Sequence, residues 1–481
     1  MNDASVPAPA PLAGRKVLLS VMMFLQYAIW GVWLPQMATY LGAAPPVGLG
    51  FDGVRIGAIL GIAGACGAIL APFLAGQVAD RFVNAEKWLG ILLVVGGLIN
   101  FSLFYARSFD AFLALSIAYS VVYMPTLALT NSICFAQLPD AERSFPRIRV
   151  WGTIGWIVAS AAFPLAWLQT DVRVIGTPWF FVGTDKPDAT SLIADSLRVS
   201  GAVSVLYGLF ALTLLPATPP RRSRVHPLAF VEAFALLRRP SVVVVSVAAL
   251  VVSMIHNIYF LRTAPWLGSV GFEQSKIGAT MSVGQMVEIG TLALLGFFLA
   301  RLGYKWVIAI GAAAYFLRFA AFALTTAATP EMAYAGIALH GFCYAFFFAA
   351  CFLFVDQVAP KDARHSAQTA FGITILGLGP ILAGFYNGWL DSVGAMNVQG
   401  TEQAPAGGVT AWWQGVLASL PPEFRVVPAA PVAAANGTLA PAPTWPAIWW
   451  TQAAIGLLVT VFVLMAFPAA DNRPARADAA D

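Results

Sequence analysis

The chain has 481 residues, of which 59% are hydrophobic and only 10% are charged, and its mean hydropathy is +0.76. Soluble globular domains carry roughly 25% charged residues, so this chain could not cover a water-facing surface and most of it is expected to lie in lipid. The formal net charge of +4 comes without a clustered basic face. The composition therefore gives no support for nucleic-acid binding.

Helices that cross a bilayer need about 20 mostly apolar residues. Twelve such stretches occur, six on each side of a polar gap. They are Lys16–Leu41, Gly53–Ala79, Trp88–Tyr105, Ala111–Leu138, Ile148–Leu168, Val199–Leu215, Ser241–Leu267, Ile277–Leu299, Val307–Ala328, Met332–Val358, Ala367–Leu390 and Pro446–Phe467. The predicted fold is an all-α polytopic membrane protein with twelve transmembrane helices in two pseudo-symmetric six-helix halves.

The composition between the stretches predicts the domain organisation. Residues 1–215 form the first half, residues 216–240 a cytoplasmic linker rich in Arg and Pro, and residues 241–470 the second half. A long outer loop over residues 392–445 is rich in Ala, Pro and Gly and is expected to be largely irregular. Residues 471–481 form a short cytoplasmic tail.

The distribution of Lys and Arg predicts the orientation, because cytoplasmic segments carry an excess of basic residues. With the N-terminus inside, 18 of the 27 basic residues fall in inner segments and seven in the longer outer segments. The other two, Arg262 and Arg318, fall within predicted spans. We therefore expect a multi-pass protein of the bacterial inner (plasma) membrane with both termini in the cytoplasm.

The junction of the second and third spans reads Gly76-Gln-Val-Ala-Asp80-Arg81. A glycine lets two helices approach closely, and an Asp-Arg pair at a helix end can latch neighbouring helices. The segment resembles the gating motif of the major facilitator superfamily, which gives Asp80 and Arg81 a gating role. A weaker echo, Arg301-Leu-Gly303-Tyr-Lys305, lies between the eighth and ninth spans, where a duplicated half would place it. The alternative is that a short inner loop simply collects charge.

Polar residues within spans mostly face the bundle interior and mark a solute path. Six spans carry polar groups and aromatic rings at helical spacing. These faces include Gln26 and Trp30; Tyr123 and Thr126; Arg149, Thr153 and Trp156; His256, Asn257 and Phe260; Gln285 and Glu288; and His340 and Tyr344. Alternating rings and hydrogen-bonding groups suit a solute with a flat body and polar edges. Interhelical hydrogen bonding and ring packing explain any single face better than a solute path does, but six such faces across both halves favour the path.

Glu288 is a mid-span carboxylate with no basic neighbour in its own helix. An ionised carboxylate is costly at that depth, so Glu288 is a candidate for loading and releasing a proton. It could instead be a structural neutral carboxyl, or pair with Arg318 or Arg262. The two histidines, His256 and His340, are more typical of hydrogen-bond donors than of proton carriers.

Several long motifs resemble the nucleoside:proton symporter family of the major facilitator superfamily. They are Phe24-Leu-Gln-Tyr-Ala-Ile-Trp-Gly-Val-Trp-Leu34, Tyr123-Met-Pro-Thr-Leu127, Phe145-Pro, Ile148-Arg-Val-Trp-Gly-Thr-Ile-Gly155, Ser282-Val-Gly-Gln-Met-Val-Glu288 and Leu317-Arg-Phe319. The resemblance spans about residues 16–467, with the long outer loop as the main mismatch.

The resemblance implies roles for individual residues. The substrate-binding set it suggests, together with the polar faces above, is Gln26, Trp30, Tyr123, Thr126, Arg149, Thr153, Trp156, Asn257, Gln285, Glu288 and Tyr344. Glu288 would also couple transport to protons. The sequence departs from the family in the tenth span, where Ala345 replaces an aspartate, and this departure leaves the substrate and the proton coupling open.

We therefore predict a secondary active transporter, a proton-coupled nucleoside symporter working by alternating access. The alternatives are a permease of a sister branch for sugars or another small polar solute, a facilitator without proton coupling, a drug-efflux antiporter, and a membrane sensor on the same fold. We expect no enzymatic activity, no cofactor and no metal site. The expected partners are the solute, protons and the lipid bilayer, and the chain is expected to be a monomer.

Overall fold

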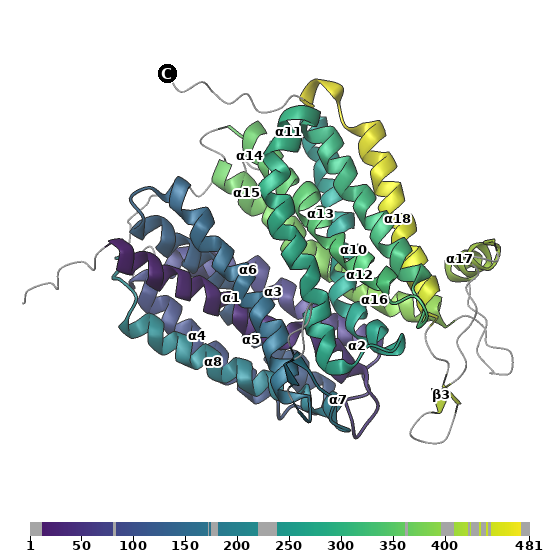
Figure 1. Cartoon of the computed structure of the whole chain (residues 1–481). Coiled ribbons are helices and arrows are strands. Elements are labelled where there is room, and N and C mark those ends of the chain that lie inside the picture. The colour runs from purple at the N-terminus through teal and green to yellow at the C-terminus, as the bar shows by residue number, and fades with distance from the viewer. Residues whose placement is uncertain are drawn as a thin grey trace, which may run out of the picture.

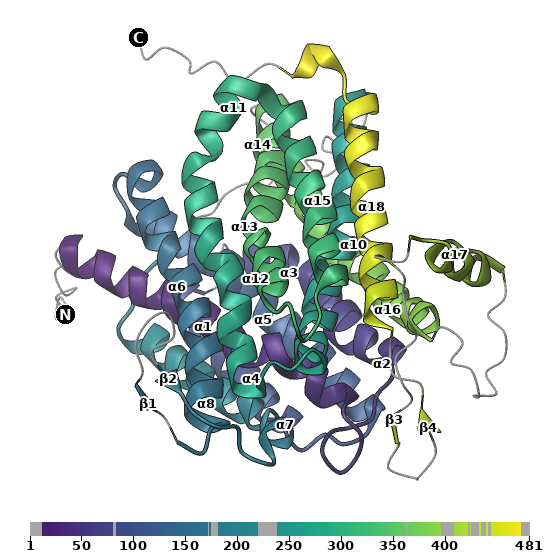
Figure 2. The same ribbon diagram turned by 45° about the vertical axis from the view of Figure 1, so that its right-hand side comes forward.

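The chain is almost entirely helical in its computed structural model (Figure 1). The structure describes residues 12–79, 83–171, 173–174, 181–219, 238–360, 364–395, 408–421, 424, 432–433, 439–440 and 444–472. Within these ranges, 11 helices are long and apolar enough to cross a membrane. The longest, α11 (Gln274–Leu324), breaks at Gly303, where φ is 74°, and its two arms make separate crossings (Figure 2). The described chain therefore crosses twelve times, which confirms the predicted fold class.

The first six crossings are built from single helices except the second, in which a π-helical turn joins two α-helices. They are α1 (Leu12–Gly42); α2 (Gly53–Gly57), η1 (Ala58–Ile62) and α3 (Ala63–Ala79); α4 (Ala85–Leu103); α5 (Phe109–Gln137); α6 (Ala141–Trp167); and α8 (Asp195–Thr213). Between α6 and α8 lie the short helix α7 (Ala189–Leu192) and the antiparallel strands β1 (Arg173–Val174) and β2 (Phe181–Val182), in which Arg173 pairs with Val182.

The second six crossings include two more interrupted helices. They are α10 (Pro240–Ser269); the two arms of α11; α12 (Glu331–Ala338), α13 (His340–Phe342), η3 (Cys343–Ala349) and α14 (Ala350–Val358); α15 (Arg364–Ile373), η5 (Thr374–Leu378) and α16 (Gly379–Gly394); and α18 (Trp445–Ala466). Helix α17 (Gly408–Ala418), the antiparallel strands β3 (Val432–Ala433) and β4 (Leu439–Ala440), and the turn η7 (Ala469–Asp471) complete the described elements.

Two local expectations differ from the structure. Helix α6 begins at Ala141, seven residues before the predicted start at Ile148, because the backbone continues its helix through polar residues that an apolar run does not include. The outer segment is less irregular than expected, because it contains α17. Trp413 of this helix donates to the Thr451 hydroxyl at 2.7 Å, which ties α17 to α18.

Each group of six crossings has its own hydrophobic core. One cluster of buried side chains runs from Leu19 to Leu215, and a second runs from Val242 to Phe467. In Figure 1 the purple and blue helices form one bundle and the green and yellow helices the other. The two bundles lie against each other at the end where α2 and α16 are neighbours (Figures 1 and 2).

A carboxylate of the second bundle holds the first bundle at this end. Asp391, near the end of α16, accepts a hydrogen bond from the backbone N–H of Gly53 at 2.7 Å, at the start of α2. The same carboxylate pairs with Arg262 of α10 at 2.7 Å. A Cβ atom at position 53 would lie 2.3 Å from the Asp391 carboxylate, so a larger residue there would displace the capping acid.

A carboxylate of the first bundle holds the second bundle in the same manner. Asp185, just before α7, accepts hydrogen bonds from the backbone N–H groups of Gln274 at 2.6 Å and Ser275 at 3.2 Å. These are the first N–H groups of α11. The first N–H groups of a helix have no partner within the helix and carry a partial positive charge. Each bundle thus caps a helix of the other with an acid.

We predict that Asp391→Asn weakens the contact between the bundles at this end. The substitution removes the ion pair with Arg262 and the negative charge at the start of α2, a loss of about 1–2 kcal/mol, or roughly 5- to 30-fold in the ratio of the two conformations. Spin labels at the exposed positions Asp110 and Ala328, on a background without the four native cysteines, report the distance by pulsed electron paramagnetic resonance. We expect the longer-distance population to increase.

The matched control is Asp195→Asn. Asp195 pairs with Arg198 at 3.3 Å and accepts from the indole N–H of Trp167 at 3.0 Å, both within the first bundle. This control should leave the distance distribution as in the wild type, whereas Asp185→Asn should behave like Asp391→Asn. Equal distributions for all four proteins would show that the acids do not hold the bundles together.

Candidate functional site

The first bundle contributes aromatic rings and one guanidinium, and these side chains come from α1 and α6. The Arg149 guanidinium carbon lies 4.2 Å from the centre of the Tyr27 ring. The Trp30 and Trp156 rings meet edge to face with their centres 6.5 Å apart. Arg149, Thr153 and Trp156 are only half-buried and follow one another along one face of α6, as their spacing predicts. This face can therefore offer a cation and flat apolar surfaces to a solute.

The second bundle contributes a carboxylate and an amide, which lie one helical turn apart on α11. The Glu288 carboxylate lies 3.8 Å from Nε2 of His340, and the Gln285 amide nitrogen lies 3.4 Å from the same atom. Two glycines permit this proximity. A Cβ atom at Gly284 would lie 2.7 Å from Cβ of His340, and one at Gly341 would lie 2.6 Å from the Glu288 backbone nitrogen.

The side chains from the two bundles face each other. Trp156 and Phe260 of α10 pack edge to face across the boundary between the bundles, with ring centres 6.3 Å apart. The charge of Arg149 acts on Glu288 and on Tyr344 of η3. We call this group (Tyr27, Trp30, Arg149, Thr153, Trp156, Phe260, Gln285, Glu288 and Tyr344) the central site.

One end of the central site is closed by contact between the bundles. Gly278 of α11 packs against the carbonyl oxygen of Ser160, where any larger side chain would collide. The Ser160 hydroxyl donates to the carbonyl of Trp156 at 2.7 Å, so the closure is one helical turn from the Trp156 ring. The acid caps described above lie beyond it at the same end.

Three of the predicted binding residues bond to one another beside the central site, and the Tyr123 ring packs against Trp30 with ring centres 5.4 Å apart. The Gln26 amide donates to the Thr126 hydroxyl at 2.7 Å, and the Tyr123 hydroxyl donates to the Gln26 carbonyl. All three side chains are buried between α1 and α5. This arrangement matches interhelical hydrogen bonding, the alternative reading of these faces.

The remaining predicted residues have mixed positions. Asn257 is half-buried, and its amide donates to the Ser253 carbonyl in its own helix at 2.8 Å. Ala345, where the family resemblance implies an acid, is fully buried in η3, whereas its neighbour Tyr344 is 36% exposed. The proposed gating residues Asp80 and Arg81 lie outside the described residues.

Tyr27 and Phe260 of the central site, and His340 beside it, are not among the binding residues that the sequence predicts. Tyr27 precedes Trp30 by one helical turn, and that spacing was the available signal for it. Phe260 and His340 were noticed on polar faces, but nothing in the sequence showed that they meet Trp156 and Glu288. Those contacts join helices far apart in the chain.

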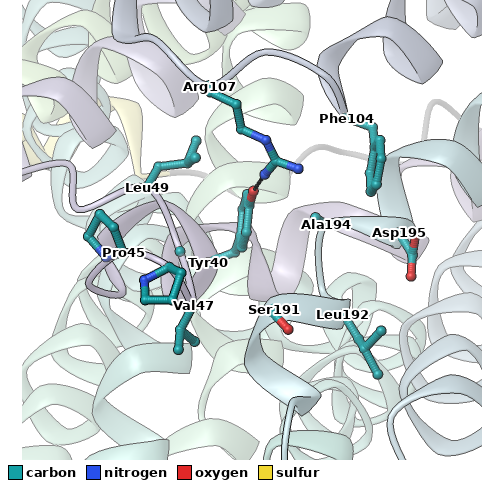
Figure 3. A pocket seen from close by; sticks show the side chains of 12 residues that line it. Tyr40, Pro45, Val47, Leu49, Phe104, Arg107, Ser191, Leu192, Ala194 and Asp195 are labelled. Carbon is teal, nitrogen blue, oxygen red and sulfur yellow. Dashed lines mark hydrogen bonds between the residues drawn. The ribbon is translucent and has the colours of Figure 1, made fainter.

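A hollow of about 460 Å³ lies away from the central site, at the end of the first bundle between α1, α4 and α8 (Figure 3). Arg107 and Asp195 supply its charges. The Arg107 guanidinium already donates to the Tyr40 hydroxyl, and Asp195 already pairs with Arg198. With both charges engaged, this hollow offers no free polar group comparable to Glu288.

Two six-helix bundles that share a half-buried polar site define a membrane transporter with the major facilitator fold. The family described as Nucleoside H+ symporter has a model that matches residues 14–418. The chain therefore belongs to the nucleoside H+ symporter family, and this agrees with the expectation that it is a transporter and not an enzyme.

Individual relatives agree with this assignment. The putative nucleoside transporter YegT of Escherichia coli K12 is 32% identical over 83% of this chain and 88% of its own length. The xanthosine permease of the same strain is 30% identical over 77% of this chain and 86% of its own. The crystal structure of the nucleoside transporter NupG matches with a TM-score of 0.72 and 25% identity, covering 94% of this chain and 98% of that one.

We predict that Thr126→Val lowers stability without changing solute affinity. The substitution leaves the buried Gln26 amide without its partner, which costs about 1–2 kcal/mol. The double variant Gln26→Leu with Thr126→Val should recover part of the loss, because no unpaired polar group then remains. Thermal unfolding in detergent measures the stability, and uridine binding measures the affinity. A large loss of affinity with unchanged stability would place this pair in the binding site.

Proposed function

We propose that this protein takes up nucleosides together with protons by alternating access, with Glu288 as the proton-binding group. One observation carries the proposal. In a chain of the nucleoside H+ symporter family, the buried Glu288 carboxylate lies 3.8 Å from His340, beside the boundary where the Trp156 and Phe260 rings of the two bundles meet.

The chemistry of Glu288 explains how a proton can drive the cycle. Its side chain is only 13% exposed, so burial disfavours the ionised carboxylate and the charge of Arg149 favours it. Protonation removes that attraction. Because the two groups belong to different bundles, taking up or releasing the proton changes the free energy of the contact between the bundles, and so shifts the balance between conformations.

The central site suits a nucleoside because it combines rings with hydrogen-bonding groups. Trp30, Trp156 and Phe260 offer flat surfaces to a base, and Thr153 and Gln285 offer polar atoms to its edges or to the ribose. Relatives at about 30% identity are named for nucleosides, whereas a D-xylose–proton symporter is similar in fold alone, at 12% identity. We therefore favour nucleosides over sugars.

The excess of Lys and Arg in the segments assigned to the inner side supports an orientation for the protein in the membrane. We propose a monomer in the bacterial inner membrane with both termini in the cytoplasm. The acid caps then lie at the outer end of the transporter.

We also propose the organisation of the chain that the sequence predicts. Residues 1–215 and 241–470 would form the two moving halves, residues 216–240 the linker, residues 392–445 the outer loop and residues 471–481 the tail. Asp80 and Arg81 would latch the inner end.

We predict that Glu288→Gln abolishes the stimulation of uridine uptake by an inside-alkaline pH gradient in proteoliposomes. One proton moving down a one-unit gradient supplies about 1.4 kcal/mol, enough for a roughly tenfold accumulation. The wild type should approach this ratio, and the variant should only equilibrate uridine. The readout is the steady-state ratio of labelled uridine inside and outside.

The control for this experiment is Glu331→Gln. Glu331 is an exposed carboxylate at the start of α12, so its loss should leave accumulation unchanged. If the folded wild type does not take up uridine, the nucleoside assignment fails and a panel of sugars becomes the next test. If Glu288→Gln still accumulates uridine, Glu288 is not the coupling residue.

A further inference from the structure

Arg318 is a fully buried cation for which the described part of the chain supplies no acidic partner. Its side chain is 0% exposed, and its guanidinium carbon lies 3.6 Å from the centre of the Tyr259 ring. Among the described residues no carboxylate pairs with it, and its Nε and Nη2 atoms have no hydrogen-bond partner. A charge placed here at such a cost is expected to serve a purpose other than stability.

A hydrogen bond from Arg318 to His340 points toward the central site. Nη1 of Arg318 lies 3.1 Å from Nδ1 of His340. A guanidinium only donates, so Nδ1 must be the acceptor and the ring hydrogen of a neutral His340 must be on Nε2. The ring orientation is fixed, because polar atoms lie against both of its nitrogens and it stacks on His256 with ring centres 5.4 Å apart.

This assignment determines the orientation of the Gln285 amide. The Gln285 atom next to His340 is the amide nitrogen, 3.4 Å from Nε2, and the Gln285 carbonyl oxygen is buried without a partner. Two donors cannot bond, and the oxygen and nitrogen of an amide are interchangeable by a half-turn. With the carbonyl oxygen accepting from His340, the NH₂ group takes the position of that buried oxygen, which has no partner.

We infer that Arg318 is a positioning residue which, through His340, makes Gln285 present a hydrogen-bond donor to the solute. In this relay the Arg318 guanidinium can only donate, so it fixes which nitrogen of His340 carries the hydrogen. That nitrogen in turn fixes the orientation of the Gln285 amide. This inference rests on the proposed nucleoside transport. It adds that Arg318, which lies outside the central site, influences which nucleoside is bound.

Uridine and cytidine test this assignment because they have nearly the same shape. Uridine has a carbonyl oxygen at position 4 of the base and an N–H at position 3. Cytidine has an amino group and an unprotonated nitrogen there, so donors and acceptors are exchanged. A site whose amide is fixed as a donor distinguishes the two, because one of them leaves a buried polar group unpaired.

The experiment measures the dissociation constants of uridine and cytidine for purified full-length protein. We expect the wild type to bind the two unequally. In Arg318→Met, His340 can carry its hydrogen on either nitrogen and Gln285 can turn, so the ratio should move toward unity by about 3- to 10-fold. Arg318→Lys retains a donor and should keep most of the wild-type ratio.

Two further variants separate positioning from folding. His340→Phe keeps a ring in the stack but breaks the relay, so it should shift the ratio as Arg318→Met does, and it replaces that variant if the latter does not fold. The double variant Arg318→Met with His340→Phe should shift the ratio no further than either single variant, because each single change already breaks the relay. Arg262→Met removes another buried arginine, at the acid cap, and should leave the ratio unchanged even if both affinities fall.

The outcomes are distinct. A wild type that binds neither nucleoside would refute the proposed function. A wild type that binds both equally, or a ratio that Arg318→Met and His340→Phe both leave unchanged, would overturn the relay while leaving nucleoside transport intact.

Discussion

The hydrocarbon of a bilayer gives a charged side chain neither water nor hydrogen-bond partners, so the protein itself must stabilise each charge within a span. Three buried or half-buried charges meet this constraint differently. Arg262 is paired with Asp391 and with the Asn387 side chain. Glu288 faces Arg149 and His340. Arg318 lies on the Tyr259 ring and donates to His340. The positions of these charges organise the interior of the molecule.

Two of these three charges, on Arg262 and Glu288, take part in contacts between the bundles. A change in either charge can therefore change how the bundles are held together. Asp391 links Arg262 to the first N–H group of α2 in the other bundle, and Glu288 responds to Arg149 across the central site. A contact between rigid bundles can change only when its free energy changes. Protonation, solute binding and the loss of a capping acid are each able to supply such a change, because each acts on a group at the boundary.

Close backbone approach makes these contacts possible. Gly53 admits the Asp391 carboxylate, Gly278 admits the Ser160 carbonyl, and Gly284 and Gly341 bring α13 against α11 so that His340 reaches Glu288. In a soluble protein the core is driven together by water. In lipid, packing and hydrogen bonds between helices take over that role, which explains why small residues mark the interfaces on which the site depends.

The sequence by itself determined the number of crossings, the two halves, the family motifs and the prominence of Glu288, because apolar length and the cost of a mid-span charge are properties of local sequence. It also placed Arg149, Thr153 and Trp156 on one face, since helical spacing fixes which residues share a side. Only the tertiary structure decided that the Gln26 amide donates to the Thr126 hydroxyl, that Phe260 meets Trp156, and that Arg318 contacts His340. Those outcomes depend on which helices become neighbours and how they are rotated, and helical periodicity carries no information about the partner that a face will meet.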